Sequence, residues 1–190
     1  MPASNPAVVY NDYPRKAQPN IVRWTMPGWF ATAMGNGSIL VNGRIKYQPI
    51  FVEEATTYIR IGARVTTIKA GGTIEVRLFA NNNGVPGALL SDYGTIALDV
   101  AASIEIVINE PLPRGYYWLA YRCPDAASAG GQLRGLTTTD GFKSPMPGNA
   151  LALGSLPYNL YHVDAAWADP APAPTNPQSV AEAILWYREN

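Results

Sequence analysis

The chain has 190 residues, of which fourteen are basic and fourteen acidic, so its formal net charge at pH 7 is +0 and only 15% of its residues are charged. This composition argues against a large basic surface for nucleic acid or an anionic membrane, and the single cysteine, Cys123, excludes an intramolecular disulfide framework. A hydrophobic content of 47% with so few charges favours a surface partly covered by other subunits, although a strand-rich domain with few exposed helix faces would show the same composition.

The first residues do not resemble a targeting segment. Met1 to Tyr10 has neither the basic start nor the apolar run of a secretory signal peptide. No stretch approaches the ~20 apolar residues that a membrane-spanning helix needs. We therefore expect a chain that is made in a cytoplasm, has no membrane partner, and stays soluble until it joins an assembly.

Residues 1–37 are predicted to form an extended N-terminal arm. Pro2, Pro6, Pro14 and Pro19 each remove a backbone donor and disfavour a helix. The arm is nevertheless rich in apolar and aromatic residues, which a disordered tail usually lacks. We expect these side chains to contact the domain itself or a neighbouring subunit. The candidate contact residues are Val8, Val9, Tyr10, Ile21, Trp24, Trp29 and Phe30.

Residues 38–190 are predicted to form one domain of short strands. Asn42-Gly43 is a strong two-residue hairpin signal, Pro49 indicates an edge position or a bulge, and residues 81–87 are predicted to form a long turn. Residues 180–187 begin with a sequence typical of a helix cap, but a chain so rich in strands favours a final strand. The predicted strands are 39–41, 44–52, 56–67, 73–80, 88–90, 95–100, 103–108, 115–123 and 133–139, followed by 180–187.

The most aromatic of these strands, residues 115–123, is predicted to lie near the middle of a sheet. Tyr117, Leu119 and Tyr121 fall on one face with Cys123, and the residues between them fall on the other. Both faces are apolar, so we expect the strand to be covered on both sides and Cys123 to be a buried, inert thiol. Residues 169–177 contain four prolines and are predicted to cross the surface stiffly. Together these patterns predict an all-β protein, an antiparallel β-sandwich with an extended N-terminal arm.

The acidic residues and the only histidine form no recognisable catalytic motif. Pairs such as Glu53-Glu54, or Asp92 with Asp99, lack the setting of a glycosidase. His162 has no G-x-S-x-G sequence to accompany it. We therefore expect no catalytic residue.

Cofactor and metal motifs are missing in the same way. Asp125 and Asp140 lie in loops that could approach calcium, but no loop has the ligand spacing of an EF-hand. Glycine loops that cradle phosphate are absent as well. We expect no cofactor and no metal site.

Three runs of the sequence resemble a known domain. They are residues 74–79 (Ile-Glu-Val-Arg-Leu-Phe), 84–94 with its G-x-P-G-x-L-L turn and strand, and 112–120 with G-Y-Y-W-L-A. The chain from about residue 39 to 190 resembles the jelly-roll domain of tailed-bacteriophage virion proteins, which occurs in tail fibres and minor structural proteins and is related to capsid decoration (cement) proteins. The resemblance implies a jelly-roll sandwich in a virion. Tail fibres usually carry a long trimeric shaft before this domain, and a short arm in its place favours a decoration or adaptor protein.

Two functional hypotheses follow from the resemblance and the aromatic content. The first is a non-enzymatic decoration protein on the capsid surface, a homotrimer whose partners are the major capsid protein and itself. The second is a receptor-binding head of a tail fibre or capsid fibre that stacks surface polysaccharide on exposed aromatic rings. Its main candidate contacts are Trp167, Trp186 and Tyr93, from a wider set that includes Trp24, Trp29, Tyr47 and Tyr58.

Overall fold

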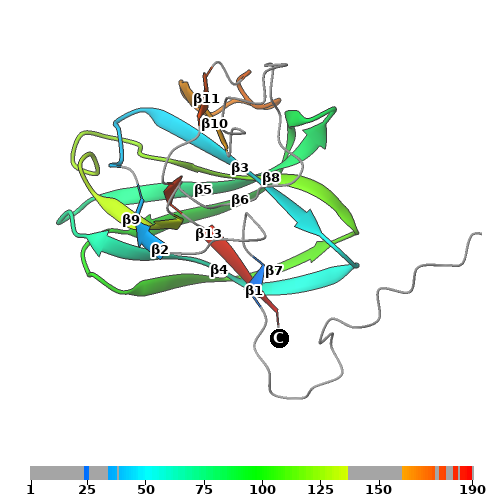
Figure 1. Ribbon diagram of the computed structural model, residues 1–190, viewed down its shortest axis with the longest axis horizontal. Coiled ribbons are helices and arrows are strands. Elements are labelled where there is room, and N and C mark those ends of the chain that lie inside the picture. Colours follow the sequence, from blue (N-terminus) through cyan, green and yellow to red (C-terminus); the bar gives the residue numbers. More distant parts are fainter. Residues whose placement is uncertain are drawn as a thin grey trace, which may run out of the picture.

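The computed structural model describes residues 24–25, 34–37, 39–136, 160–173, 176–178, 182–183 and 185–189. Within these ranges the chain is all-β, with thirteen strands in two antiparallel sheets and no helix. The two sheets pack as a β-sandwich, and Figure 1 shows β10 and β11 on one side of the molecule and β1 and β7 on the opposite side. The predicted fold class is therefore confirmed at the level of a β-sandwich.

Each sheet collects strands from distant parts of the chain. Sheet 1 consists of β1 (Trp24–Thr25), β2 (Met34–Asn36), β4 (Thr56–Thr67), β7 (Ser103–Leu112), β9 (Gln132–Leu136), β12 (Glu182–Ala183) and β13 (Leu185–Glu189). Sheet 2 consists of β3 (Arg44–Val52), β5 (Thr73–Asn82), β6 (Val85–Ala97), β8 (Gly115–Arg122), β10 (Leu160–Asp164) and β11 (Asn176–Gln178), in the order β11-β10-β3-β8-β5-β6. The final strand predicted at residues 180–187 is thus part of the sandwich, as β12 and β13.

Strand β8 lies in the middle of sheet 2, between β3 and β5, as its aromatic sequence predicted. Leu119 and Tyr121 point into the core between the sheets, and Cys123 follows them. Trp118 and Ala120 are buried on the opposite face. The strand is covered on both sides because successive side chains alternate and both sets are apolar.

The core between the sheets is built from the apolar faces of both. Its buried members include Ile61, Ala63 and Val65 of β4 and Leu185 and Tyr187 of β13. Ile104, Ile106 and Ile108 of β7 pack against it at the edge. This alternation places the residues between them on the outer face of sheet 1.

Strand β4 departs from strict alternation at one point. Strict alternation would place Tyr58 and Ile61, three residues apart, on opposite faces of the strand, but both are buried in the core. The pairing register shifts between Tyr58 and Arg60 on both neighbouring strands, which marks a β-bulge at this point. The bulge turns Tyr58 inward, where its ring stacks on that of Tyr187 at 4.6 Å.

Two loop predictions are corrected by the structure. The predicted long turn at 81–87 is a tight hairpin, because Asn83 and Gly84 both have positive φ (50° and 88°) and Asn82 pairs with Val85. Such values are typical of a type I′ turn, which joins twisted strands with two residues. Strand β6 is therefore continuous from Val85 to Ala97, and Gly94, with φ of 80°, lies beside one of its register shifts instead of ending the strand.

The Asn42-Gly43 sequence forms a turn but not the predicted hairpin. The backbone N–H of Arg44 donates to the carbonyl of Val41 (3.1 Å), yet residues 39–41 form no strand. The chain instead crosses here from the edge of sheet 1 to sheet 2. Pro49 lies beyond the described pairing of β10 with β3, which ends at Tyr47, and pairs with Trp118 of β8 on its other side.

The N-terminal region joins sheet 1 at two points. Strand β1 pairs with β13, and β2 pairs with β9. Residues 24–25 and 34–36, which belong to the predicted arm, are therefore edge strands of the sandwich. The other residues of that arm lie outside the described ranges, as do the predicted strand residues 137–139.

Candidate functional site

The outer face of sheet 2 is covered by residues 165–173, which we call the covering segment. Its backbone is held at both ends, because the N–H of Ala165 donates to the carbonyl of Gly43 (3.2 Å) and that of Ala171 donates to Gly87 (2.9 Å). Asp169 accepts a hydrogen bond from the backbone N–H of Leu89 at 3.0 Å. The segment crosses the sheet as the prolines predicted, although residues 176–178 form β11.

Trp167 is the central side chain of the covering segment. Its ring lies 5.8 Å from that of Phe79, and the guanidinium of Arg77 lies 4.8 Å from its centroid. Its indole N–H donates to Oε2 of Glu75 at 2.6 Å. The side chain is half-buried, so its ring is engaged with the sheet on which it lies.

Three ion pairs lie on and around the described part of this face of sheet 2. Arg122 contacts Glu75 (3.1 Å) and Arg77 contacts Asp92 (2.7 Å). At the edge, Arg44 binds Asp164 through two hydrogen bonds, and these lower the pKa of that carboxyl group. The covering segment packs against the buried side chains on the outer face of sheet 2, and these ion pairs lie around it.

One aromatic pair, Phe51 and Tyr116, lies at the end of this face and is partly exposed at Tyr116. The rings of Phe51 and Tyr116 are 4.5 Å apart, Tyr116 is 39% exposed, and the guanidinium of Arg114 lies 5.9 Å from the ring of Phe51. Sequence reasoning did not select this pair. It could have been found from the register, since residues directly opposite on neighbouring strands share a face and Phe51 pairs with Tyr116.

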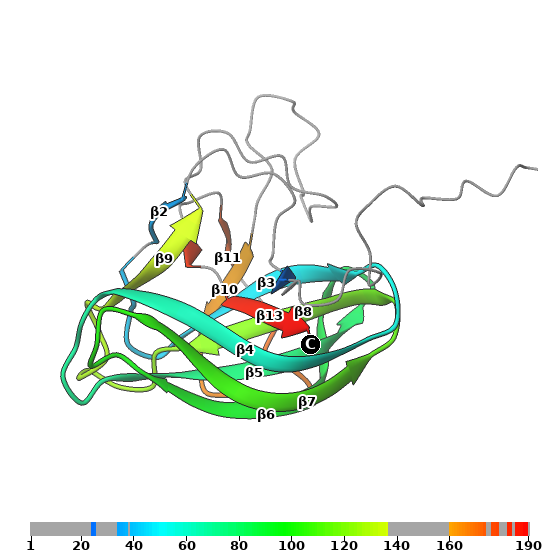
Figure 2. The same cartoon turned by 90° about the horizontal axis from the view of Figure 1, so that it is seen from below.

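Tyr93 belongs to a hydrogen-bonded network inside the sandwich. Its hydroxyl donates to Oε2 of Glu110 (2.9 Å) and shares a hydrogen bond with the hydroxyl of Tyr187 (2.8 Å). Ser91 donates to the same carboxylate at 2.5 Å. Burial raises the pKa of both Tyr93 and Tyr187 well above the ordinary value. The network joins β6 to β7 where the edges of the two sheets run side by side (Figure 2).

The outer face of sheet 1 is organised around Gly62. A Cβ atom at this position would lie 2.7 Å from the carbonyl oxygen of Ile104, 2.8 Å from Nε1 of Trp186 and 3.0 Å from Cγ of Glu105. The indole of Trp186 therefore lies directly against the bare backbone of β4, which leaves it only 8% exposed. Arg188 and Glu105 form an ion pair (3.3 Å) that spans β4 from the strands on either side.

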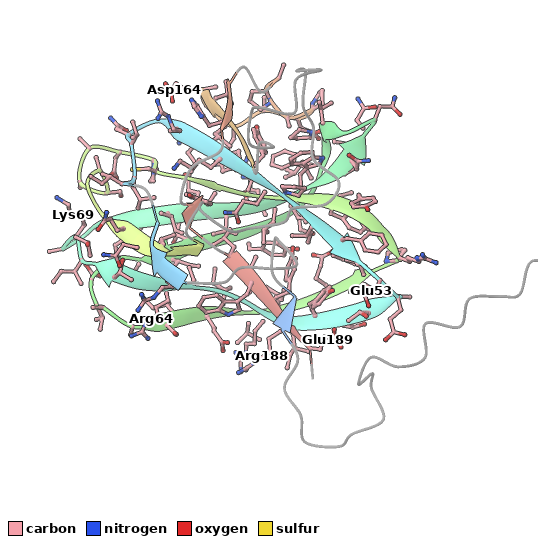
Figure 3. The ribbon with its side chains drawn as sticks, viewed as in Figure 1. Glu53, Arg64, Lys69, Asp164, Arg188 and Glu189 are labelled. Carbon is pink, nitrogen blue, oxygen red and sulfur yellow. The ribbon has the colours of Figure 1, made fainter. Side chains whose placement is uncertain are left out.

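Arginines accumulate on this face. Arg60 lies directly opposite Arg188 in the pairing of β4 with β13, and Arg64 follows four residues along β4 on the same side. In the described part of the chain neither Arg60 nor Arg64 has an ion-pair partner, and the buried Nε atom of Arg60 has no hydrogen-bond partner. Figure 3 labels Arg64 and Arg188 along the same side of the molecule. We call Arg60, Arg64 and Arg188 the arginine face.

The structure does not bring the predicted glycan contacts together. Trp167 lies on sheet 2 under the covering segment, Trp186 lies on sheet 1 against Gly62, and Tyr93 lies in the network between the sheets. The predicted arm contacts Val8, Val9, Tyr10, Ile21, Trp29 and Phe30 lie outside the described residues, and Trp24 is described only as backbone in β1.

The described residues that the sequence offered for catalysis or metal binding are buried or hydrogen-bonded within the fold. The thiol of Cys123 is buried, which raises its pKa, and His162 is buried on β10. Asp99 accepts from the backbone of Gly71 (2.6 Å), and hydrogen bonds from Ser128 lower the pKa of Asp125. Among the described residues, no group of three or more histidines, cysteines or carboxylates lies together as a metal site would require. That same part of the chain has no helix of the length and apolarity that crossing a membrane requires.

Comparisons with known proteins return nothing for this chain. No protein-family model, no curated protein and no solved structure matches it.

Proposed function

We propose that this chain is a non-enzymatic structural protein of a bacteriophage virion, and most specifically a decoration protein that binds and stabilises the outer capsid surface. In this proposal the sandwich is a jelly roll, the protein acts as a homotrimer with the major capsid protein as its partner, and no cofactor takes part. Its mechanism is the burial of apolar and aromatic area between subunits, which adds contacts that must break before the shell opens.

The attachment of the N-terminal region to sheet 1 is the observation that carries this proposal. Because β1 lies beside β13 at the end of sheet 1, the described N-terminal residues enter the sandwich at the edge of this sheet. The opposite face of the molecule is closed by the covering segment. In the proposed role, the closed side faces solvent and the side with the N-terminal region contacts the shell.

The engagement of its carboxylates supports a structural role in place of a catalytic one. Glu75, Glu105 and Glu110 each bind groups of other strands, and Asp92 and Asp164 pair with arginines. Carboxylates held in this way tie strands to one another. A glycosidase would instead hold two of them across a substrate cleft.

Deleting residues 1–22 tests the proposed function. This deletion keeps β1 and β2, whose loss would strip two edge strands from sheet 1. The truncated chain should keep the melting temperature of the full-length protein but should no longer co-sediment with capsids. The full-length protein should occur in virions in high copy number. Capsid binding that survives the deletion, or hydrolysis of a glycan by the purified chain, would contradict the proposal.

The Phe51–Tyr116 pair favours a second candidate, a receptor-binding head on a tail fibre or capsid fibre. Tyr116 offers a partly exposed ring beside an arginine, and sugars stack on such rings. Under this alternative, Tyr116→Ala should abolish binding to host cells or their polysaccharide, and the protein should be rare in the virion. Unchanged binding by this variant would rule out the pair as the glycan contact.

A further inference from the structure

We propose that the arginine face binds a carboxylate-rich segment of the shell protein, with Arg60 and Arg64 as its main contacts. This inference rests on the proposed function, because it names the chemistry of the partner that the decoration protein would meet. It concerns a surface on sheet 1, the side on which the N-terminal region is attached.

The cross-strand register sets Arg60 between two neighbours. On one side it lies opposite Arg188 of β13, and on the other it lies opposite Val107 of β7. Like charges directly opposite each other in a sheet destabilise it. Glu105 relieves this for Arg188, with which it forms an ion pair, but Arg60 has no such carboxylate in the described part of the chain. An external carboxylate beside Arg60 would remove the repulsion and pair its guanidinium.

Arg64 extends the site along the same strand. It is exposed, lies opposite Ser103 of β7, and has no ion pair within the described ranges. Four residues of a strand span about 13 Å, which separates Arg60 from Arg64. An extended partner segment repeats its side chains on one face at the same spacing, so two of its carboxylates can reach both arginines. Arginine suits this task because its planar fork binds a carboxylate through two hydrogen bonds.

Val107 favours a protein segment over an acidic polysaccharide. This side chain is 70% exposed beside Arg60. An acidic peptide can place an apolar side chain against it between two carboxylates, and burial of that contact adds to the binding. A polyuronate chain presents hydrated hydroxyl groups at the same place and would leave the contact unmade.

The test measures binding of a fluorescent oligoglutamate peptide to the full-length protein by anisotropy, at low ionic strength and then with added salt. The double variant Arg60→Gln/Arg64→Gln should bind on the order of tenfold more weakly than wild type. The variant Arg60→Lys/Arg64→Lys keeps the charge and should recover part of the affinity. The matched control is Arg114→Gln, which removes an exposed arginine beside Phe51 on sheet 2 and should bind as wild type does.

Three outcomes would overturn the inference. They are no binding of oligoglutamate, equal weakening by Arg114→Gln, and preferential binding of polygalacturonate. Circular dichroism of each variant shows whether its fold is intact, and the lysine variant provides a second, charge-retaining readout. The test can fail without contradicting the proposed function. A chain that binds capsids through its N-terminal region but does not bind oligoglutamate would contradict only this inference.

Discussion

The two outer faces of this sandwich differ in what covers them and in whether their arginines form ion pairs. On sheet 2, residues 165–173 lie across the strands, Trp167 covers Phe79, and Arg77 and Arg122 each meet a carboxylate. On sheet 1, Trp186 fills the space over Gly62, but Arg60 and Arg64 have no ion pair in the described part of the chain. A closed face gains its stability from the chain itself. Charges left unneutralised on a face contribute little to folding and remain available to a partner.

The largest expected effect comes from opening the closed face. Trp118 is 2% exposed under the covering segment, so Trp118→Ala should lower the free energy of unfolding by about 3–5 kcal/mol. Tyr116→Ala, two residues earlier on the same face of β8, should cost less than about 1 kcal/mol because that side chain is already partly exposed. Urea denaturation of the two variants measures the difference. Equal losses would mean that the covering segment does not seal the face.

Alkaline pH should lower the stability of the fold through the buried tyrosines Tyr93 and Tyr187, which lie between the two sheets. Burial raises the pKa of Tyr93 and Tyr187, so in the folded protein they stay protonated above the value of 10.0 at which they ionise when unfolded. Their contribution to stability is complete below that value and is lost as pH rises above it. Two such tyrosines should cost about 3 kcal/mol at about pH 11. Melting temperatures across this range would show the loss, and a flat profile would contradict the buried network. Tyr187→Phe should reduce the slope.

A methyl group at Gly62 tests how tightly the other face is packed. Gly62→Ala would press a Cβ against the backbone of Ile104 and the indole of Trp186, so stability should fall by about 1–3 kcal/mol. The control is Gly115→Ala on sheet 2, where the nearest atom would be 3.6 Å away and the change should be nearly neutral. The melting temperatures of the Gly62→Ala and Gly115→Ala variants compare the packing at the two sites. A neutral Gly62→Ala would show that Trp186 can shift away from β4.

The smallest effect should come from the arginine face. Arg60→Gln/Arg64→Gln should change the free energy of unfolding by less than about 0.5 kcal/mol, because neither side chain has an ion pair to lose within the described ranges. Arg122→Gln on sheet 2 removes the contacts with Glu75 and the carbonyl of Ala165 and should cost about 1 kcal/mol. Chemical denaturation of the two variants measures and compares their free energies of unfolding. A large loss on sheet 1 would give its arginines a role in folding.

Local pattern was enough to identify most strands but not their irregularities. Residues 44–52 and 56–67 were predicted with the observed bounds, since alternation and turn residues mark them clearly. The bulge that turns Tyr58 inward could not be predicted, because it depends on which strands lie on either side of β4. The hairpin at Asn83-Gly84 was missed for another reason. The glycines and prolines around it were taken as one loop, although Pro86 and Gly87 lie in β6.

The candidate sites show the same division. The arginine face required β4 and β13 to be adjacent, and more than 120 positions separate Arg60 from Arg188 in the sequence. The aromatic residues were recognised as important, but the sequence could not distinguish Trp167 and Trp186, which are packed against the sheets, from Tyr116, which is partly exposed.

The amino-acid pattern alone predicts a β-sandwich whose central strand is covered on both faces. The alternation of side chains along β8 is a local property of the backbone, and both of its faces are apolar. Tertiary packing sets which face is closed by residues 165–173 and which carries Arg60 and Arg64, two arginines that have no ion pair among the described residues. The physical reason is that a strand pattern fixes which residues share a face, whereas the cover of that face comes from segments distant in the chain.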